Sequence, residues 1–180
     1  MKLIFSLLLI LAFFKEVDAQ KMYTTSLGQV KLKSNSKIEN LIAENNKAES
    51  RWLENNGQLF FSFLLKNFLF ENPNAEYDYI DYFTENGKYP QAVFKGFIQD
   101  IQHIDLTSSG GNEISIEGTL TMHGVTQKIL LNANLTVLSS GKIMLKTDFT
   151  IKWKDFHIAT KEKASNTAQE TVFGIFFIYD

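Results

Sequence analysis

Three consecutive segments of this sequence alternate apolar and polar residues with a period of two. Apolar residues and one glycine occupy the even positions of 113–122, whereas apolar residues occupy the odd positions of 128–137 and most odd positions of 142–153. Successive side chains of a β-strand point to opposite faces, so each segment is predicted to be a strand with one buried face. Short turns at 123–124 and 139–141 would join the three strands into an antiparallel meander.

Other parts of the chain have the same character, and no long segment has the 3.6-residue period of a helix. Residues 172–179 are apolar on both faces, which predicts that this strand lies against a second covered surface. The aromatic and acidic stretch between Pro73 and Pro90 differs, and a short helical segment is expected near 75–86. About eight antiparallel strands that each bury one face remove their exposed edges by closing, so we expect an all-β, eight-stranded antiparallel barrel. Its remaining strands are predicted at 29–33, 38–45, 47–54, 58–66 and 92–104.

The first nineteen residues have the pattern of a secretory signal. Lys2 precedes an unbroken apolar run over 3–14, and the residues before Gln20 resemble a cleavage site. The run would make about 18 Å of helix, too short for a hydrocarbon core of about 30 Å. We therefore expect a signal peptide over 1–19, one barrel domain over 20–180, and a periplasmic or secreted protein with no stable membrane span. The chain has no cysteine, so no disulfide stabilises it.

The sequence offers little for catalysis or metal binding. His103, His123 and His157 lie in separate segments without the spacing of converging metal ligands, and no nucleophile motif is present. His123 precedes Gly124 in a tight turn, where a structural role is expected for its ring. The formal net charge of −2 gives no electrostatic footprint for nucleic acid, and no cofactor is expected. A group of carboxylates is predicted to form a solvated helix face and not a calcium site: Glu76, Asp78, Asp81 and Glu85.

An eight-stranded barrel either fills its interior with side chains or holds one small ligand. The predicted inward rows carry almost no charge, so the interior would accept only an apolar guest. Gly96, Gly118, Ala133 and Gly174 would leave room for it, although the same glycines fit a solid core with bent strands. The residues predicted to line a ligand site are Phe61, Phe63, Phe68, Phe70, Tyr79, Phe94, Ile98, Ile116, Leu120, Leu131, Leu135 and Phe149. The hydroxyls of Tyr77, Tyr79 and Tyr82 could meet a polar head group.

Four stretches of the sequence resemble the YceI-like family. They are "FSFLLKNFLFEN" (61–72), "KYPQAVFKGFI" (88–98), "GTLTMHGVTQKI" (118–129) and "FTIKWKDFHI" (149–158). The resemblance implies a lipocalin-like barrel, exported to the periplasm or beyond, whose interior holds a long apolar molecule such as a polyisoprenoid or an amidated fatty acid. It brings no catalytic residues, and His123 falls on the family's hairpin turn. The chain departs from the family's pattern around 50–51, over 73–87 and after 158.

Three functions remain open at this stage. The first is an exported, non-catalytic binding protein that sequesters or carries an isoprenoid, quinone-like or fatty-acyl molecule. The second is a barrel enzyme of the isomerase or cyclase type acting on a lipid, for which Glu76, Asp78 and His103 are the available candidates. The third is an interaction module with a filled core and an exposed apolar patch. The oligomeric state is left open, with a dimer as one alternative.

Overall fold

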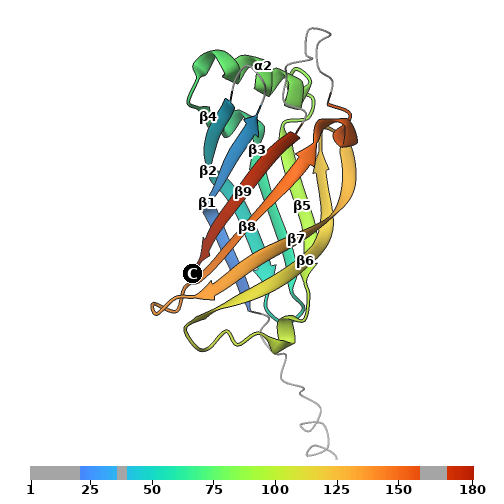
Figure 1. Ribbon diagram of the computed structural model, residues 1–180. Helices are drawn as coiled ribbons and strands as arrows, with labels where there is room; N and C mark the ends of the chain where they lie inside the picture. Colours follow the sequence, from blue (N-terminus) through green and yellow to red (C-terminus); the bar gives the residue numbers. More distant parts are fainter. Residues whose placement is uncertain (1–20, 36–39, 159–169) are drawn as a thin grey trace, which may run out of the picture.

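The computed structural model describes residues 21–35, 40–158 and 170–180, in which nine strands form one antiparallel sheet (Figure 1). The sheet order is β1-β9-β8-β7-β6-β5-β3-β2-β4, and an additional pairing of β1 with β2 closes the barrel. Eight strands thus make the wall, and the two-residue β4 adds to the edge of β2. The predicted all-β, eight-stranded barrel is confirmed. The strands are β1 (Met22–Asn35), β2 (Asn40–Leu53), β3 (Gln58–Leu64), β4 (Leu69–Phe70), β5 (Gln91–Ile98), β6 (Gly110–Met122), β7 (Val125–Val137), β8 (Ile143–Lys152) and β9 (Glu170–Tyr179).

The predicted meander is formed by β6, β7 and β8. Met122 pairs with Val125, so only two residues make the first turn. His123 and Gly124 have φ of 51° and 73°, as a two-residue hairpin turn with matching twist requires. A Cβ on Gly124 would lie 2.6 Å from the ring of Tyr89, so this position needs glycine for space as well as for conformation.

The N-terminal half differs from the prediction. The chain does not turn at Asn45-Asn46: 40–53 forms the single strand β2, and residues 38–39 lie outside the described residues. A register shift between β1 and β2 marks a bulge at this place. Asn45 is buried, and its Nδ2 donates to the carbonyl of Leu64 (2.9 Å) while its Oδ1 accepts from the backbone N–H of Lys47 (2.9 Å). The strand β1 is also longer than the predicted 29–33.

Two further strand predictions are corrected. The strand predicted at 92–104 ends at Ile98, and the 3-10 helix η3 (Ile101–His103) follows, with His103 exposed. The prediction of a second covered surface along 172–179 is wrong, because Val172 and Ile178 on the outer face of β9 are 40% and 39% exposed.

The expected short helix is α2 (Pro73–Thr84), which lies across one end of the barrel (Figure 1). Proline suits the first position of a helix because the N–H that it lacks has no partner there. After Thr84 the chain turns through Glu85, Asn86 and Gly87, which all have positive φ, and reaches β5. We call α2 the lid helix and the end of the barrel that it covers the lid end.

Candidate functional site: the barrel interior and its lid

The twelve residues predicted to line a ligand site come together in one hydrophobic cluster. Eleven of them are buried, and Phe70 of β4 is half-buried against the same cluster. They come from β3, β4, β5, β6, β7, β8, the lid helix and the segment between β3 and β4. The cluster also contains buried side chains from β1, β2 and β9, so every barrel strand contributes to it.

Aromatic rings span the interior from β3 to β9. These two strands are not neighbours in the wall, because β2 and β1 lie between them. The rings of Phe61 and Phe177 lie 5.7 Å apart, and those of Phe63 and Phe173 lie 5.6 Å apart. Phe149 of β8 stacks on Phe173 at 5.5 Å. The interior is therefore filled by touching rings at these two levels. An occupant has to move them.

The glycines of the wall do not leave the free space that the sequence suggested. Gly96 and Gly118 face inward, but a Cβ on Gly118 would lie 2.5 Å from Cζ of Phe94, whose ring covers both glycines. Phe177 uses Gly28 in the same way. Gly174 belongs to the outer face, where its Cβ would lie 2.8 Å from Oδ1 of Asp148. The glycines therefore let large rings lie close against the wall.

The buried polar side chains of the described residues are all uncharged: Ser34, Asn45, Ser50, Thr84, Thr147 and Thr171. Among the proposed catalytic groups, Glu76 and His103 are exposed, on the lid helix and on η3 at the opposite end, and the side chain of Asp78 lies outside those described. No group of three His, Cys, Asp or Glu side chains that could hold a metal ion occurs in the described part of the chain. No described helix is long and apolar enough to cross a membrane.

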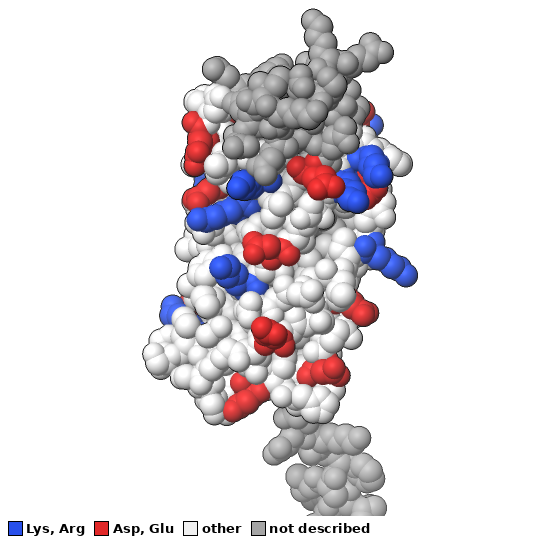
Figure 2. Space-filling view, in the orientation of Figure 1, with Lys and Arg blue, Asp and Glu red and all other residues white. Residues whose placement is uncertain are grey.

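The outer surface carries both signs of charge. On the face shown in Figure 2, acidic and basic side chains lie mostly singly among uncharged residues, and the formal net charge of the chain is −2. The face therefore presents no continuous basic surface over the residues described there.

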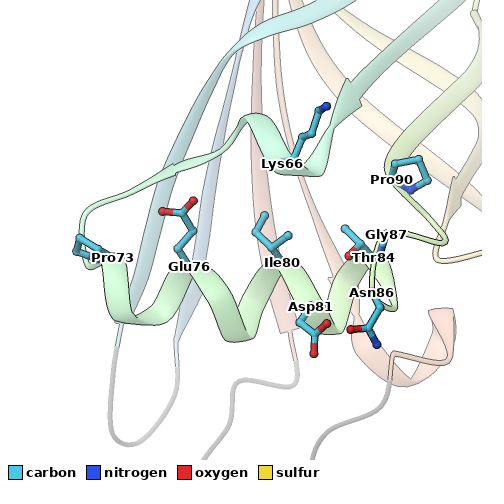
Figure 3. A pocket seen from close by; sticks show the side chains of 9 residues that line it. All are labelled: Lys66, Pro73, Glu76, Ile80, Asp81, Thr84, Asn86, Gly87 and Pro90. Atoms are coloured by element: carbon cyan, nitrogen blue, oxygen red, sulfur yellow. Dashed lines mark hydrogen bonds between the residues drawn. The ribbon is translucent and has the colours of Figure 1, made fainter.

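A pocket of about 670 Å³ lies between the lid helix and the rim of the barrel (Figure 3). Glu76 and Ile80 extend from the helix toward the 3-10 helix η2 (Leu65–Asn67), and Lys66 projects from η2. This rim pocket combines the apolar side chains of Ile80 and two prolines with polar groups and charges of both signs. Its lining consists of Lys66, Pro73, Glu76, Ile80, Asp81, Thr84, Asn86, Gly87 and Pro90.

Another face of the lid helix seals the barrel with aromatic rings. Tyr79 stacks on Phe83 at 4.1 Å, and Phe83 meets the ring of Trp153 edge-on at 5.1 Å. The Tyr79 side chain is 1% exposed, and its hydroxyl makes no hydrogen bond. Burial raises the pKa of Tyr79 well above its usual value. The neighbouring Thr171 opposes this rise only in part, and the two hydroxyls make no hydrogen bond of ordinary geometry. The side chains of Tyr77 and Tyr82 lie outside those described.

Alkaline pH is expected to destabilise the fold through its buried tyrosines. Burial raises the pKa of both Tyr79 and Tyr179, whereas tyrosines of the unfolded chain ionise near pH 10. The stability gained by keeping both phenols neutral is fully present below that pH and is lost as the pH rises toward their raised pKa values. Urea unfolding at about pH 8 and about pH 11 measures the loss. Tyr79→Phe should lose less stability over this interval than the wild type, and an equal loss would contradict the shift at Tyr79.

His123 has the structural role expected of it, but its ring bonds the backbone of a distant segment and not that of its own turn. Its Nδ1 lies 3.1 Å from the carbonyl oxygen of Phe156, in the 3-10 helix η4 (Trp153–Phe156) that follows β8. The ring of Tyr89 packs on the imidazole at 4.9 Å. The β6–β7 turn, the start of β5 and the end of β8 are thus held together at the rim of the lid end.

Residues 55–174, two thirds of the chain, match the YceI-like domain family. The chain belongs to this family. The match runs from the β2–β3 turn into β9, and so includes the His123 hairpin, the lid helix and most of the wall. No curated protein matches the chain.

Solved structures of this YceI-like fold resemble the chain at low sequence identity. A polyisoprenoid-binding domain from Saccharophagus degradans is 16% identical with a TM-score of 0.75, over 89% of this chain and 98% of that one. BcnA from Burkholderia cenocepacia is 16% identical with a TM-score of 0.64, over 84% and 95%. A YceI protein from Campylobacter jejuni is 20% identical with a TM-score of 0.54, over 93% and 91%. At these identities the likeness establishes the fold.

Phe173 and Phe177 belong to the interior but were not among the predicted lining residues. The period-two pattern of 172–179 could not assign them to a face, because the residues on both faces are apolar. On the neighbouring strand β8, charged and inward-facing residues alternate, which marks the inner face of that strand. Phe173 pairs with Phe149 and Phe177 pairs with Leu145, so the register places both phenylalanines on the inner face.

Proposed function

We propose that this YceI-like protein is exported and binds, without catalysis, a long apolar molecule inside the barrel, of the isoprenoid, quinone-like or fatty-acyl class. The observation that carries this proposal is that all eight barrel strands direct buried apolar side chains into one cluster, in which the buried polar side chains described are uncharged. The similar fold of a polyisoprenoid-binding domain supports the same class of ligand. The signal pattern over 1–19, which lies outside the described residues, supports export.

The energetics allow a ligand to replace the contacts between rings. A chain that buries about 400 Å² of apolar surface gains about 10 kcal/mol at about 25 cal/mol per Å². Turning a phenylalanine away from its preferred rotamer costs about 0.5–1.5 kcal/mol. Rotation of Phe61 and Phe63 away from β9 also gives up their contacts with Phe177 and Phe173, and the apolar surface of the ligand takes the place of these contacts. The gain that is left after these costs is available for ordering the ligand.

A second candidate function is an interaction module with a filled core. The rings that touch across the interior favour it, and so do exposed apolar side chains on the outer wall. Phe97 is 50% exposed and lines an outer depression of about 590 Å³ over β2, β3, β5 and β6. This candidate and the carrier differ in where an apolar molecule would bind.

Native mass spectrometry of the purified protein, followed by organic extraction, tests the carrier. We expect a bound apolar molecule that survives gentle desolvation and is recovered in the extract. Quenching by a brominated fatty-acid probe adds a location, because the two tryptophans, Trp52 and Trp153, are both buried at the interior. Phe97→Ser is the control: it removes an outer apolar side chain and should change neither result. Absence of both co-purified ligand and quenching in the wild type would end the carrier proposal, and binding abolished by Phe97→Ser would favour the interaction module.

A further inference from the structure

A row of buried polar groups follows the wall at the lid end. Trp153 Nε1 donates to the hydroxyl oxygen of Thr171 (3.0 Å), and the Thr171 hydroxyl donates to Ser34 Oγ (3.2 Å). The Ser34 hydroxyl in turn donates to the carbonyl oxygen of Glu170 (2.5 Å). The side chains of Ser34, Thr171 and Trp153 are at most 2% exposed. Every donor of this row therefore has an acceptor although the row is closed off from solvent.

Tyr79 brings one more donor next to Thr171, and its hydroxyl makes no hydrogen bond of ordinary geometry. The ring is held between Phe83, on which it stacks, and Trp153, which it meets edge-on at 6.3 Å. The hydroxyl consequently cannot turn to solvent. A buried donor without a partner destabilises the fold, and such groups are rare in folded proteins. An acceptor atom supplied by a ligand would remove that cost.

The surroundings restrict the acceptor to a neutral atom. Among the described residues, the buried polar side chains carry no charge, and Lys66 at the rim is exposed. A phosphate or carboxylate beside Tyr79 would be a buried charge with no buried counter-ion among the described side chains, which is strongly unfavourable. A carbonyl oxygen accepts the hydrogen bond without that penalty. Below the polar row, Phe68 and Phe63 lie within 6.3 Å of Phe173, so apolar surface for a tail begins next to it.

We propose, on the basis of the function proposed above, that the Tyr79 hydroxyl is a head-group contact: it donates a hydrogen bond to the carbonyl oxygen of a neutral long-chain lipid whose tail lies along the rings of the interior. The ligand class is thus an ester, amide, ketone or quinone, and not a phosphorylated or anionic lipid. Thr171 and Trp153 form the polar wall against which the carbonyl group lies.

The opposite end of the interior also holds an unpartnered donor. Trp52 Nε1 is buried without an acceptor, and its ring stacks on Tyr23 at 4.5 Å. The Tyr179 hydroxyl beside it is already paired with Ser50 Oγ (2.8 Å). The lid end is favoured because the polar row of Trp153, Thr171 and Ser34 lies beside Tyr79, whereas the polar contact beside Trp52 is the single pair of Tyr179 and Ser50.

Binding of palmitamide, hexadecane and hexadecyl phosphate to the purified protein tests this contact by displacement of a fluorescent apolar dye. We expect Tyr79→Phe to weaken palmitamide binding about 10-fold, the effect of one lost hydrogen bond, and to leave hexadecane binding unchanged. The variant keeps the ring and removes an unpartnered hydroxyl, so its melting temperature should not fall. Thr147→Val is the matched control: it removes a buried hydroxyl that donates to the carbonyl of Asn132 (2.8 Å), and palmitamide should bind to it as to the wild type.

The other outcomes separate this proposal from the carrier function. Equal weakening of palmitamide and hexadecane by Tyr79→Phe would make Tyr79 a packing residue and leave the carrier function standing. Tightest binding of hexadecyl phosphate, lost in Lys66→Ala, would overturn the proposal in favour of a charged head group at the rim. Selective loss of palmitamide in Trp52→Phe and not in Tyr79→Phe would place the head group at the opposite end. Failure of all three probes to bind the wild type would overturn both proposals.

Discussion

Phe173→Ala is expected to lower the free energy of unfolding by about 3–5 kcal/mol, the range for truncating a fully buried phenylalanine. Phe173 is 0% exposed, and its ring contacts those of Phe63, Phe68 and Phe149. The truncation removes one half of a ring pair that spans the barrel, and the rigid wall cannot collapse to fill the space. Urea unfolding of the variant and the wild type measures the difference.

Phe97→Ala is the matched control for this truncation. It makes the same chemical change on the outer face of β5, where Phe97 is 50% exposed, and the expected loss is below about 1 kcal/mol. If the carrier function holds, a long-chain ligand should restore part of the stability lost in Phe173→Ala, because it fills the new space and binds only the folded state. Equal losses in the two variants would contradict the packing of Phe173 across the interior.

The barrel could be predicted because most strands bury one face and expose the other. In β6 and β8 the alternation is nearly complete, so both the strand and its inward face follow from local sequence. The Asn45-Asn46 pair shows the limit of this approach. Asparagines are common in turns and tolerated at bulges, and the hydrogen bond from Asn45 to the carbonyl of Leu64 that favours the bulge joins residues nineteen positions apart.

The composition of the site was easier to predict than its packing. All twelve candidates lie in the cluster, and parity alone assigns the nine on the long strands to the inside. Phe68, Phe70 and Tyr79 lie outside those strands and were chosen for their aromatic character. Contacts across the interior, such as Phe61 with Phe177, depend on how the closed wall places β3 relative to β9, which no local pattern contains. The orphaned hydroxyl of Tyr79 likewise depends on where the lid helix sets its ring. These non-local contacts determine how wide the interior is.

Gly118 lets the ring of Phe94 lie close against the wall, and Gly118→Ala tests this contact. The added Cβ would lie 2.5 Å from the carbonyl oxygen of Lys95 on β5 and 2.5 Å from the ring of Phe94. The backbone contact cannot be relieved by rotating a side chain, so we expect a loss of about 2–3 kcal/mol, in the upper part of the range for overpacked cores. Chemical denaturation measures the loss, and the displaced Phe94 ring should also weaken binding of an apolar probe.

Gly111→Ala makes the same change in the same strand without the clash. Its Cβ would make one ordinary contact, 3.6 Å from Oγ1 of Thr136, so stability should change by less than about 1 kcal/mol and probe binding should not change. Phe94→Leu removes ring atoms near Gly118, and in a double-mutant cycle it should recover part of the Gly118→Ala loss, with a coupling of about 0.5–3 kcal/mol. No coupling, together with equal stability of Gly118→Ala and Gly111→Ala, would mean that the Phe94 ring is not held over Gly96 and Gly118. The interior would then be wider than the ring contacts require, and a ligand could enter without moving them.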